Sequence, residues 1–124
     1  MEFNQPVFDP AQFDLLLELC DDNDYSVIEE VLTQFFADLA KLLEQLDQGT
    51  AHSDYCVVAD AAHTLKGSCS VFGMIQVQTA SRELELAAQA ENPRDVERWV
   101  RELRDALGPG CEAIRTRMAS LKKA

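Results

Sequence analysis

Apolar residues recur along most of this chain at alternating steps of three and four positions, the spacing that places side chains on one face of an α-helix. The clearest stripe lies between about Tyr25 and Gln48, and two more lie between about Ser53 and Phe72 and between about Met74 and Glu91. A fourth follows Asn92-Pro93, where asparagine suits the cap and proline the first turn of a helix. In chain order the stripes contain Ile28, Leu32, Phe35, Leu39, Leu42 and Leu46; Val58, Ala62, Leu65, Cys69 and Phe72; Val77, Ala80, Leu84 and Ala87 or Ala88; and Val96, Val100, Leu103, Leu107, Ile114, Met118 and Leu121.

Shorter signals mark where helices begin and end. Asp9-Pro10 opens a short helix that runs through about Cys20, with an apolar side formed by Phe13, Leu16 and Leu17. The run Ser26-Val27-Ile28-Glu29 fits a capping box for the first long helix, with Asp24 as the alternative cap. Gly49 is the expected stop of that helix.

The last stripe is interrupted by Gly108-Pro109-Gly110. Proline inside a helix costs about 3 kcal/mol and each glycine about 1 kcal/mol more, so a straight helix is not expected. Because the apolar register continues across the interruption, we expect either a kink or two helices stacked nearly in line.

No run of alternating or β-rich residues is long enough for a sheet, so the fold class is all-α. Short connections between long amphipathic helices place neighbours antiparallel. The expected architecture is an antiparallel up-down four-helix bundle with a short extra N-terminal helix and a kinked or broken C-terminal helix. We expect residues 1–124 to form one domain, with a core from about residue 10 to residue 121.

The composition narrows the classes of function. The 124 residues include 22 Asp and Glu against 11 Lys and Arg, a formal net charge of −11, while 47% of the chain is hydrophobic. That much apolar content excludes a disordered acidic tail, and the charge argues against binding to nucleic acid or an anionic membrane surface. The longest uncharged stretch, Gly67–Ser81, is too short and polar to span a bilayer, and residues 1–20 lack a signal-peptide pattern. We therefore expect a soluble, cytoplasmic protein.

Metal sites and disulfides are not expected. The four cysteines are far apart with no C-x-x-C pair, which favours free thiols acting as small hydrophobes, although one disulfide stays possible: Cys20, Cys56, Cys69 and Cys111. Asp21, Asp22 and Asp24 fit a loop with capping residues better than a calcium loop. His52 is expected to be solvated, and Trp99 to pack partly buried or to mark a contact surface.

One segment departs from the rules of a good helix. His63 lies on the flank of the core stripe, and its neighbours one or two turns away are Ala59, Lys66, Gly67 and Ser70. The small residues Ala59, Gly67 and Ser70 would let a partner reach the imidazole, and Gly67 costs about 1 kcal/mol relative to alanine in a helix interior. A neutral imidazole is a nucleophile near pH 7, and Lys66 would neutralise a phosphoryl group accepted there. From these features alone, a solvated surface histidine remains the commoner interpretation.

The run Ala62-His63-Thr64-Leu65-Lys66-Gly67, followed six residues later by Gly73, resembles the A-H-x-L-K-G-x-x-x-x-x-G signature of histidine-containing phosphotransfer (HPt) domains. Phe35-Phe36 resembles part of the family's preceding helix, and Leu84-Glu85 resembles a Leu-Glu pair of its following helix. The resemblance covers about residues 10 to 121. Cys69 and Met74 depart from the usual residues in ways that leave the chemistry intact, whereas Gly108-Pro109-Gly110 is less usual for the last helix.

The resemblance implies a role for each matching residue. His63 would be phosphorylated through Nε2, Lys66 would help to neutralise the phosphoryl group, and Gly67 would give a receiver domain access. Gly73 would end the helix at a tight turn. Glu85 stands where family members often hydrogen-bond the imidazole Nδ1, although an ordinary solvated glutamate is the alternative.

These roles predict a phosphocarrier of a two-component phosphorelay rather than an enzyme. It would accept a phosphoryl group from a receiver aspartyl phosphate or a kinase, such as a hybrid sensor histidine kinase, and pass it to a response-regulator receiver. The chain has no Gly-rich phosphate loop or Walker motif, so the receiver would supply Mg²⁺ and most of the catalysis, and we expect no cofactor. A helical adaptor that binds a receiver without phosphoryl exchange is the alternative, and a helical metal-binding protein is a weaker one. We expect a monomer, and Met1 and the length favour a free-standing protein.

Overall fold

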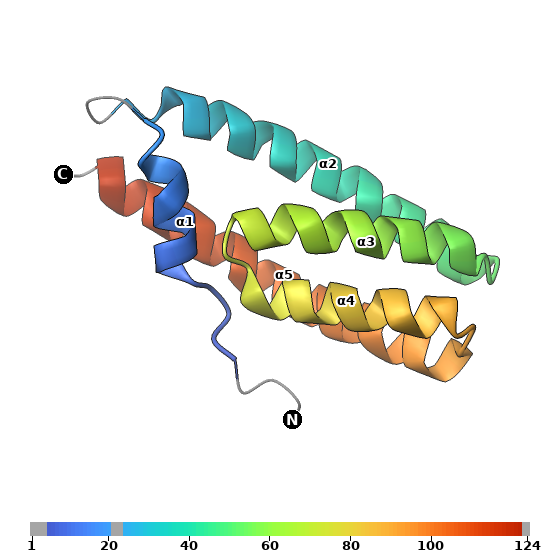
Figure 1. Ribbon diagram of the computed structural model, residues 1–124. Coiled ribbons are helices and arrows are strands. Elements are labelled where there is room, and N and C mark those ends of the chain that lie inside the picture. Colours follow the sequence, from blue (N-terminus) through green and yellow to red (C-terminus); the bar gives the residue numbers. More distant parts are fainter. Residues whose placement is uncertain (1–4, 21–23, 123–124) are drawn as a thin grey trace.

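Five helices form the computed structural model, which describes residues 5–20 and 24–122. They are α1 (Pro10–Leu17), α2 (Ser26–Ala51), α3 (Tyr55–Val71), α4 (Ile75–Gln89) and α5 (Pro93–Lys122). The four long helices run alternately up and down beside one another, and α1 lies near one end of the bundle (Figure 1). No residue within the described ranges is in a strand. The all-α fold and the up-down arrangement predicted from the sequence are confirmed.

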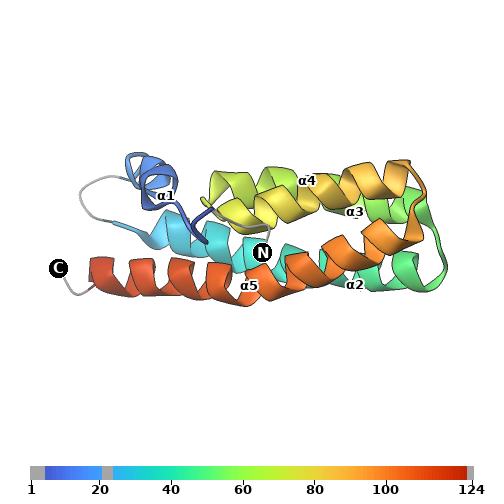
Figure 2. The same ribbon diagram turned by 90° about the horizontal axis from the view of Figure 1, so that it is seen from below.

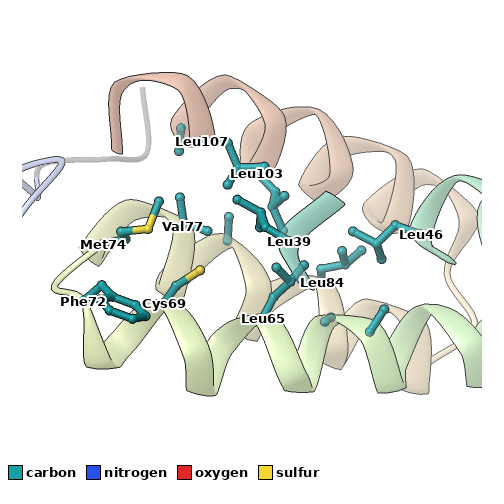
Figure 3. Packing of buried hydrophobic residues seen from close by; sticks show 14 of the residues in the cluster. Leu39, Leu46, Leu65, Cys69, Phe72, Met74, Val77, Leu84, Leu103 and Leu107 are labelled. Atoms are coloured by element: carbon teal, nitrogen blue, oxygen red, sulfur yellow. The ribbon is translucent and has the colours of Figure 1, made fainter. Parts of the chain in front are cut away.

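The core is built from the predicted stripes of the four long helices, whose side chains meet in the bundle interior (Figure 3). Leu65 of α3, Leu84 of α4 and Leu103 of α5 are completely buried. Each fully buried leucine contributes about 1.5–3 kcal/mol relative to an exposed one. Among the described helices, α3 and α4 make the most extensive contact with each other. Small side chains let these two helices lie close together, and the following ones are buried: Ala61, Ala62, Ala80, Ser81, Ala87 and Ala88.

The first long helix begins and ends differently from the prediction. Tyr25 occupies the N-cap position and makes no side-chain capping hydrogen bond, so neither Ser26 nor Asp24 is the cap residue. Asp24 lies one position earlier, and its Oδ1 accepts a hydrogen bond of 3.1 Å from the Ser26 amide at the start of the helix. The helix also continues through Gly49 to Ala51, so the predicted stop was wrong. Gly49 is buried, and a Cβ there would lie 2.9 Å from Cγ2 of Val58. This glycine therefore serves the close approach of α2 and α3 rather than the end of a helix.

Gly73 lies in the short turn between α3 and α4 and has a left-handed backbone, with φ +76°. The amide of Asp9 donates a 2.8 Å hydrogen bond to the Gly73 carbonyl, and a Cβ on Gly73 would lie 2.5 Å from the Asp9 carbonyl oxygen. Conformation and space both require glycine here. The N-terminal segment is thus fastened to the turn that ends α3, and α1 is fastened to α5 by a bidentate pair between Asp14 and Arg117.

The C-terminal helix is not broken. α5 is continuous from Pro93 to Lys122 with Pro109 inside it, and Figure 2 shows its direction changing along its length. Proline removes one backbone donor and crowds the preceding turn, which bends a helix without necessarily ending it. A Cβ on Gly110 would lie 2.7 Å from Cε of Met74, so this glycine makes room for the α3–α4 turn against α5.

Several smaller expectations can be compared with the structure. All four cysteines are free thiols, and Cys69 is buried in the core with its pKa raised to about 12 by that burial. Cys56 is exposed and does not pack as a small hydrophobe. His52 is exposed and Trp99 is half-buried.

Membrane-spanning helices and metal-binding clusters are absent from the described residues. None of the helices within residues 5–20 and 24–122 is long and apolar enough to cross a membrane. The same residues contain no group of three or more His, Cys, Asp or Glu side chains that could hold a metal ion. Asp21 and Asp22, for which a loop is predicted, lie outside the described residues.

Candidate functional site

His63 projects from the exposed surface of α3. Its side chain is 66% exposed, although Ala62 just before it and Leu65 two positions later are completely buried. The helix starts at Tyr55 because Asp54 caps it, its Oδ1 accepting a 3.3 Å hydrogen bond from the Val57 amide. The helix is thus anchored by its core side and by its cap, and it presents the imidazole to solvent.

A carboxylate on the neighbouring helix holds the imidazole. Nδ1 of His63 lies 3.0 Å from Oε2 of Glu85 on α4, and Glu85 is only 17% exposed. A carboxylate can only accept a hydrogen bond, so Nδ1 carries the proton in this pair. The neutral ring then has its lone pair on Nε2, which makes no hydrogen bond to any described residue.

Lys66 shares the same carboxylate. Its Nζ donates a 3.0 Å hydrogen bond to Oε1 of Glu85, so the two oxygens of Glu85 serve two partners from adjacent turns of α3. The hydrogen bond from Lys66 is the main cause that lowers the pKa of the Glu85 carboxyl, with smaller contributions from the charges of Lys66 and His63, while partial burial acts in the opposite direction. Glu85 is therefore a carboxylate at neutral pH and suits the orientation of an imidazole.

The other predicted residues surround His63 on α3. Gly67, one turn later, is exposed, and a Cβ built on it would meet no atom within 4 Å. Ala59, one turn earlier, is half-buried beside a hollow at the start of the helix. Ser70 is also half-buried, with its hydroxyl turned back to the Gly67 carbonyl at 2.8 Å. The helix surface around the imidazole therefore carries few bulky side chains.

Two exposed valines beside this surface were missed by the sequence reasoning. Val31 of α2 and Val71 of α3 are each 43% exposed and line a groove of about 360 Å³ between the two helices. Phe35 and Phe72 form its deeper lining, with ring centroids 4.4 Å apart. Val71 follows Gly67 by one turn, so the groove continues the face that carries His63. The sequence contains a signal for this groove, because Val31 and Val71 are apolar residues that lie outside the predicted core stripes.

A larger hollow, of about 600 Å³, lies elsewhere, between the N-terminal segment and α5. It is lined mainly by apolar groups such as Val7, Phe8 and Pro109 and does not include His63. His63 instead lies on open surface, with the carboxylate of Glu85 and the ammonium of Lys66 beside it. The geometry around His63 therefore defines the candidate site.

Three comparisons place the chain among known proteins. The family model of the Hpt domain matches residues 30–122. Histidine-containing phosphotransfer protein 2 of Arabidopsis thaliana is 33% identical over 84 residues, which are 65% of this chain and 54% of that protein, so the chain spans about half the length of this relative. The crystal structure of a histidine-containing phosphotransfer protein from Medicago truncatula has a similar fold, with a TM-score of 0.74 and 24% identity, covering 94% of this chain and 78% of that one.

The family model includes α3 with His63, the α3–α4 turn and Glu85, and it extends over nearly all of the four-helix bundle. The resemblance noted in the sequence is thus matched by an independent family model, by a relative and by the fold. The chain belongs to the Hpt domain family.

Proposed function

We propose that this chain is a phosphocarrier of a two-component phosphorelay that accepts a phosphoryl group on His63. The donor is the aspartyl phosphate of a receiver domain or a sensor histidine kinase, and the acceptor is the aspartate of a response-regulator receiver. The observation that carries this proposal is the pairing of Nδ1 with Glu85 on an exposed helix surface, which leaves Nε2 as the free nucleophile.

In the transfer step, the phosphoryl group moves directly from the donor aspartate to Nε2 of His63, and no cofactor on this chain is required. The Nε2 lone pair forms the N–P bond while the P–O bond to the donor aspartate breaks, and the electron pair of that bond remains on the aspartate carboxylate. The imidazole becomes cationic, with its Nδ1 proton facing Glu85. Delivery to the next receiver reverses these steps, and the neutral imidazole is restored. Lys66 supplies a positive charge beside the phosphoryl group.

The partner supplies the rest of the catalysis. A receiver brings Mg²⁺ and the aspartate, and the open backbone at Gly67 and the small side chains at Ala59 and Ser70 give it room. The groove beside Val71 offers apolar surface for its docking. We further propose that residues 1–124 act as one domain, as a monomer in the cytoplasm, a reducing compartment that suits four free thiols.

The test is transfer of label from phosphorylated receivers to this protein in the presence of Mg²⁺. The wild type should acquire acid-labile, base-stable label, and His63→Gln should acquire none. His52→Gln is the matched control, because His52 is the other histidine of the chain and is also exposed. It should label like the wild type.

The same experiment separates the adaptor function. If the wild type and His63→Gln bind a receiver equally and neither acquires label from any receiver, the chain is a receiver-binding adaptor and the phosphocarrier proposal is wrong. Label that persists in His63→Gln would place the nucleophile elsewhere and would also contradict it.

A further inference from the structure

One carboxylate of the site is shared by two groups that the phosphotransfer reaction needs. Glu85 accepts a hydrogen bond from His63 on Oε2 and one from Lys66 on Oε1, both at 3.0 Å. Its side chain is 17% exposed, whereas those of His63 and Lys66 are 66% and 33% exposed. Glu85 is therefore the fixed member of this group, and the ammonium of Lys66 lies at the end of a flexible four-carbon chain.

In the unphosphorylated state Lys66 is already paired. A phosphoryl group on Nε2 would bring three oxygens with negative charge to the other side of the same imidazole. Movement of the ammonium toward those oxygens would weaken its contact with Glu85, because Glu85 is held by His63 and by its own helix. The hydrogen bond from Lys66 is also the main cause of the lowered pKa of Glu85.

We propose that Glu85 competes with the phosphoryl group for Lys66, and that this competition limits how strongly the site stabilises phosphohistidine. The proposal rests on the proposed function of His63 and adds a second role to Glu85, a positioning residue for both the imidazole and the ammonium. A phosphocarrier benefits from such an arrangement, because a phosphoryl group held too tightly would not pass to the next receiver. Lys66 would then contribute less to the phosphorylated state than an unpaired lysine at the same place.

A double-mutant cycle on the transfer equilibrium tests the competition. The wild type, Lys66→Ala, Glu85→Gln and the double variant are each mixed with one phosphorylated receiver and Mg²⁺, and the ratio of phosphorylated carrier to phosphorylated receiver is measured at equilibrium. The glutamine keeps an oxygen that can accept from Nδ1 but loses the charge that holds the ammonium. The effect of Glu85→Gln on the imidazole itself is present in both arms of the cycle and cancels.

Competition predicts that Lys66 matters more when Glu85 is neutral. We expect Lys66→Ala to lower the equilibrium ratio about twofold in the wild-type background and about fivefold or more in the Glu85→Gln background, the size of one weak charge interaction near a surface. The matched control is Lys41→Ala on α2, which removes an exposed lysine outside the site and should change the ratio equally in both backgrounds.

The outcomes distinguish this proposal from the proposed function. If Lys66→Ala lowers the equilibrium ratio equally in the two backgrounds, or less in the Glu85→Gln background, the proposed competition is wrong, because the ammonium would then serve both groups at once. His63 would still be the carrier. If the wild type acquires no label on His63, the proposed function fails and this inference fails with it. Thermal unfolding of each variant verifies that all four proteins are folded.

Discussion

Replacing Gly67 with alanine should stabilise the free protein and slow its reaction with a receiver. Gly67 is exposed inside α3, and a Cβ there meets no atom within 4 Å. Alanine is favoured over glycine in a helix interior by about 1 kcal/mol, because glycine loses more backbone freedom on folding. Nothing in the surroundings opposes that gain. For a domain of this size the expected rise in Tm is about 3–6 °C.

The added methyl group lies one turn from His63, on the surface that a receiver would approach in the proposed function. A displacement of the reacting groups by about 1 Å costs on the order of a hundredfold in rate. We therefore expect a moderate loss for Gly67→Ala, about threefold to tenfold, and a loss near a hundredfold for Gly67→Gln, whose longer side chain obstructs docking. Thermal unfolding measures the stability, and quenched-flow transfer of label from a phosphorylated receiver measures the rate.

Gly108→Ala is the matched control, because Gly108 is an exposed glycine inside α5 with no atom within 4 Å of a built Cβ. It should leave the transfer rate unchanged. Its gain in stability should be smaller than that of Gly67→Ala, because a Cβ on the residue before Pro109 disfavours the helical backbone. If Gly67→Ala destabilises the protein, the backbone there is not open. If both substitutions at Gly67 leave transfer unchanged, this glycine has no part in docking.

Three other substitutions follow from the structure. Gly73→Ala should lower the free energy of unfolding measured in urea. The loss should exceed about 1–2 kcal/mol, the cost of a left-handed alanine, because the added Cβ would also displace the backbone of Asp9. An unchanged midpoint of urea unfolding would contradict this. Val71→Ser should weaken receiver binding in calorimetry about fivefold to tenfold with little change in stability, whereas Leu15→Ser on α1, also exposed, should not alter binding. Because Lys66 lowers the pKa of the Glu85 carboxyl below 4.5, this carboxylate stabilises the fold above pH 4.5, and the contribution is lost as the pH falls through the lowered pKa. Glu85→Gln should therefore lose less stability on acidification than the wild type, and identical acid profiles would contradict the pairing.

The contact between His63 and Glu85 joins residues 22 positions apart and was expected only from the family resemblance. The sequence does contain a second signal for it. A short turn centred near Met74 folds α3 and α4 into an antiparallel pair, and such a pair brings together residues equally distant from the turn. His63 and Glu85 are each eleven residues from Met74. The helix boundaries therefore place His63 and Glu85 at the same level along the antiparallel pair. The contact of Lys66 with the same carboxylate depends in addition on the length of the lysine side chain.

The errors share a different physical origin. Gly49 was interpreted from local rules as a stop, and Gly108-Pro109-Gly110 as a kink or a break, yet Gly49 and Gly110 both lie within continuous helices where another helix or turn approaches closely. The pair between Asp14 and Arg117 spans 103 positions of the sequence. Local propensity describes the cost of a glycine or proline in a helix, but the packing that offsets this cost depends on which element lies opposite.

The position of the site within the bundle explains how His63 can be held in place while its side chain stays largely exposed. His63 lies near the middle of a helix whose opposite side is buried, and its partner Glu85 follows the fully buried Leu84 on the adjacent helix. The separation of the imidazole and the carboxylate is thus set by the packing of two helices rather than by a loop. In the proposed function, a receiver that docks on this surface would meet a nucleophile whose orientation is already set by Glu85, so the energy of docking need not be spent on ordering it. The same open surface that makes His63 accessible would leave the exclusion of water to the proposed partner, and for this reason we expect the interface to extend beyond His63 onto the helix faces around it.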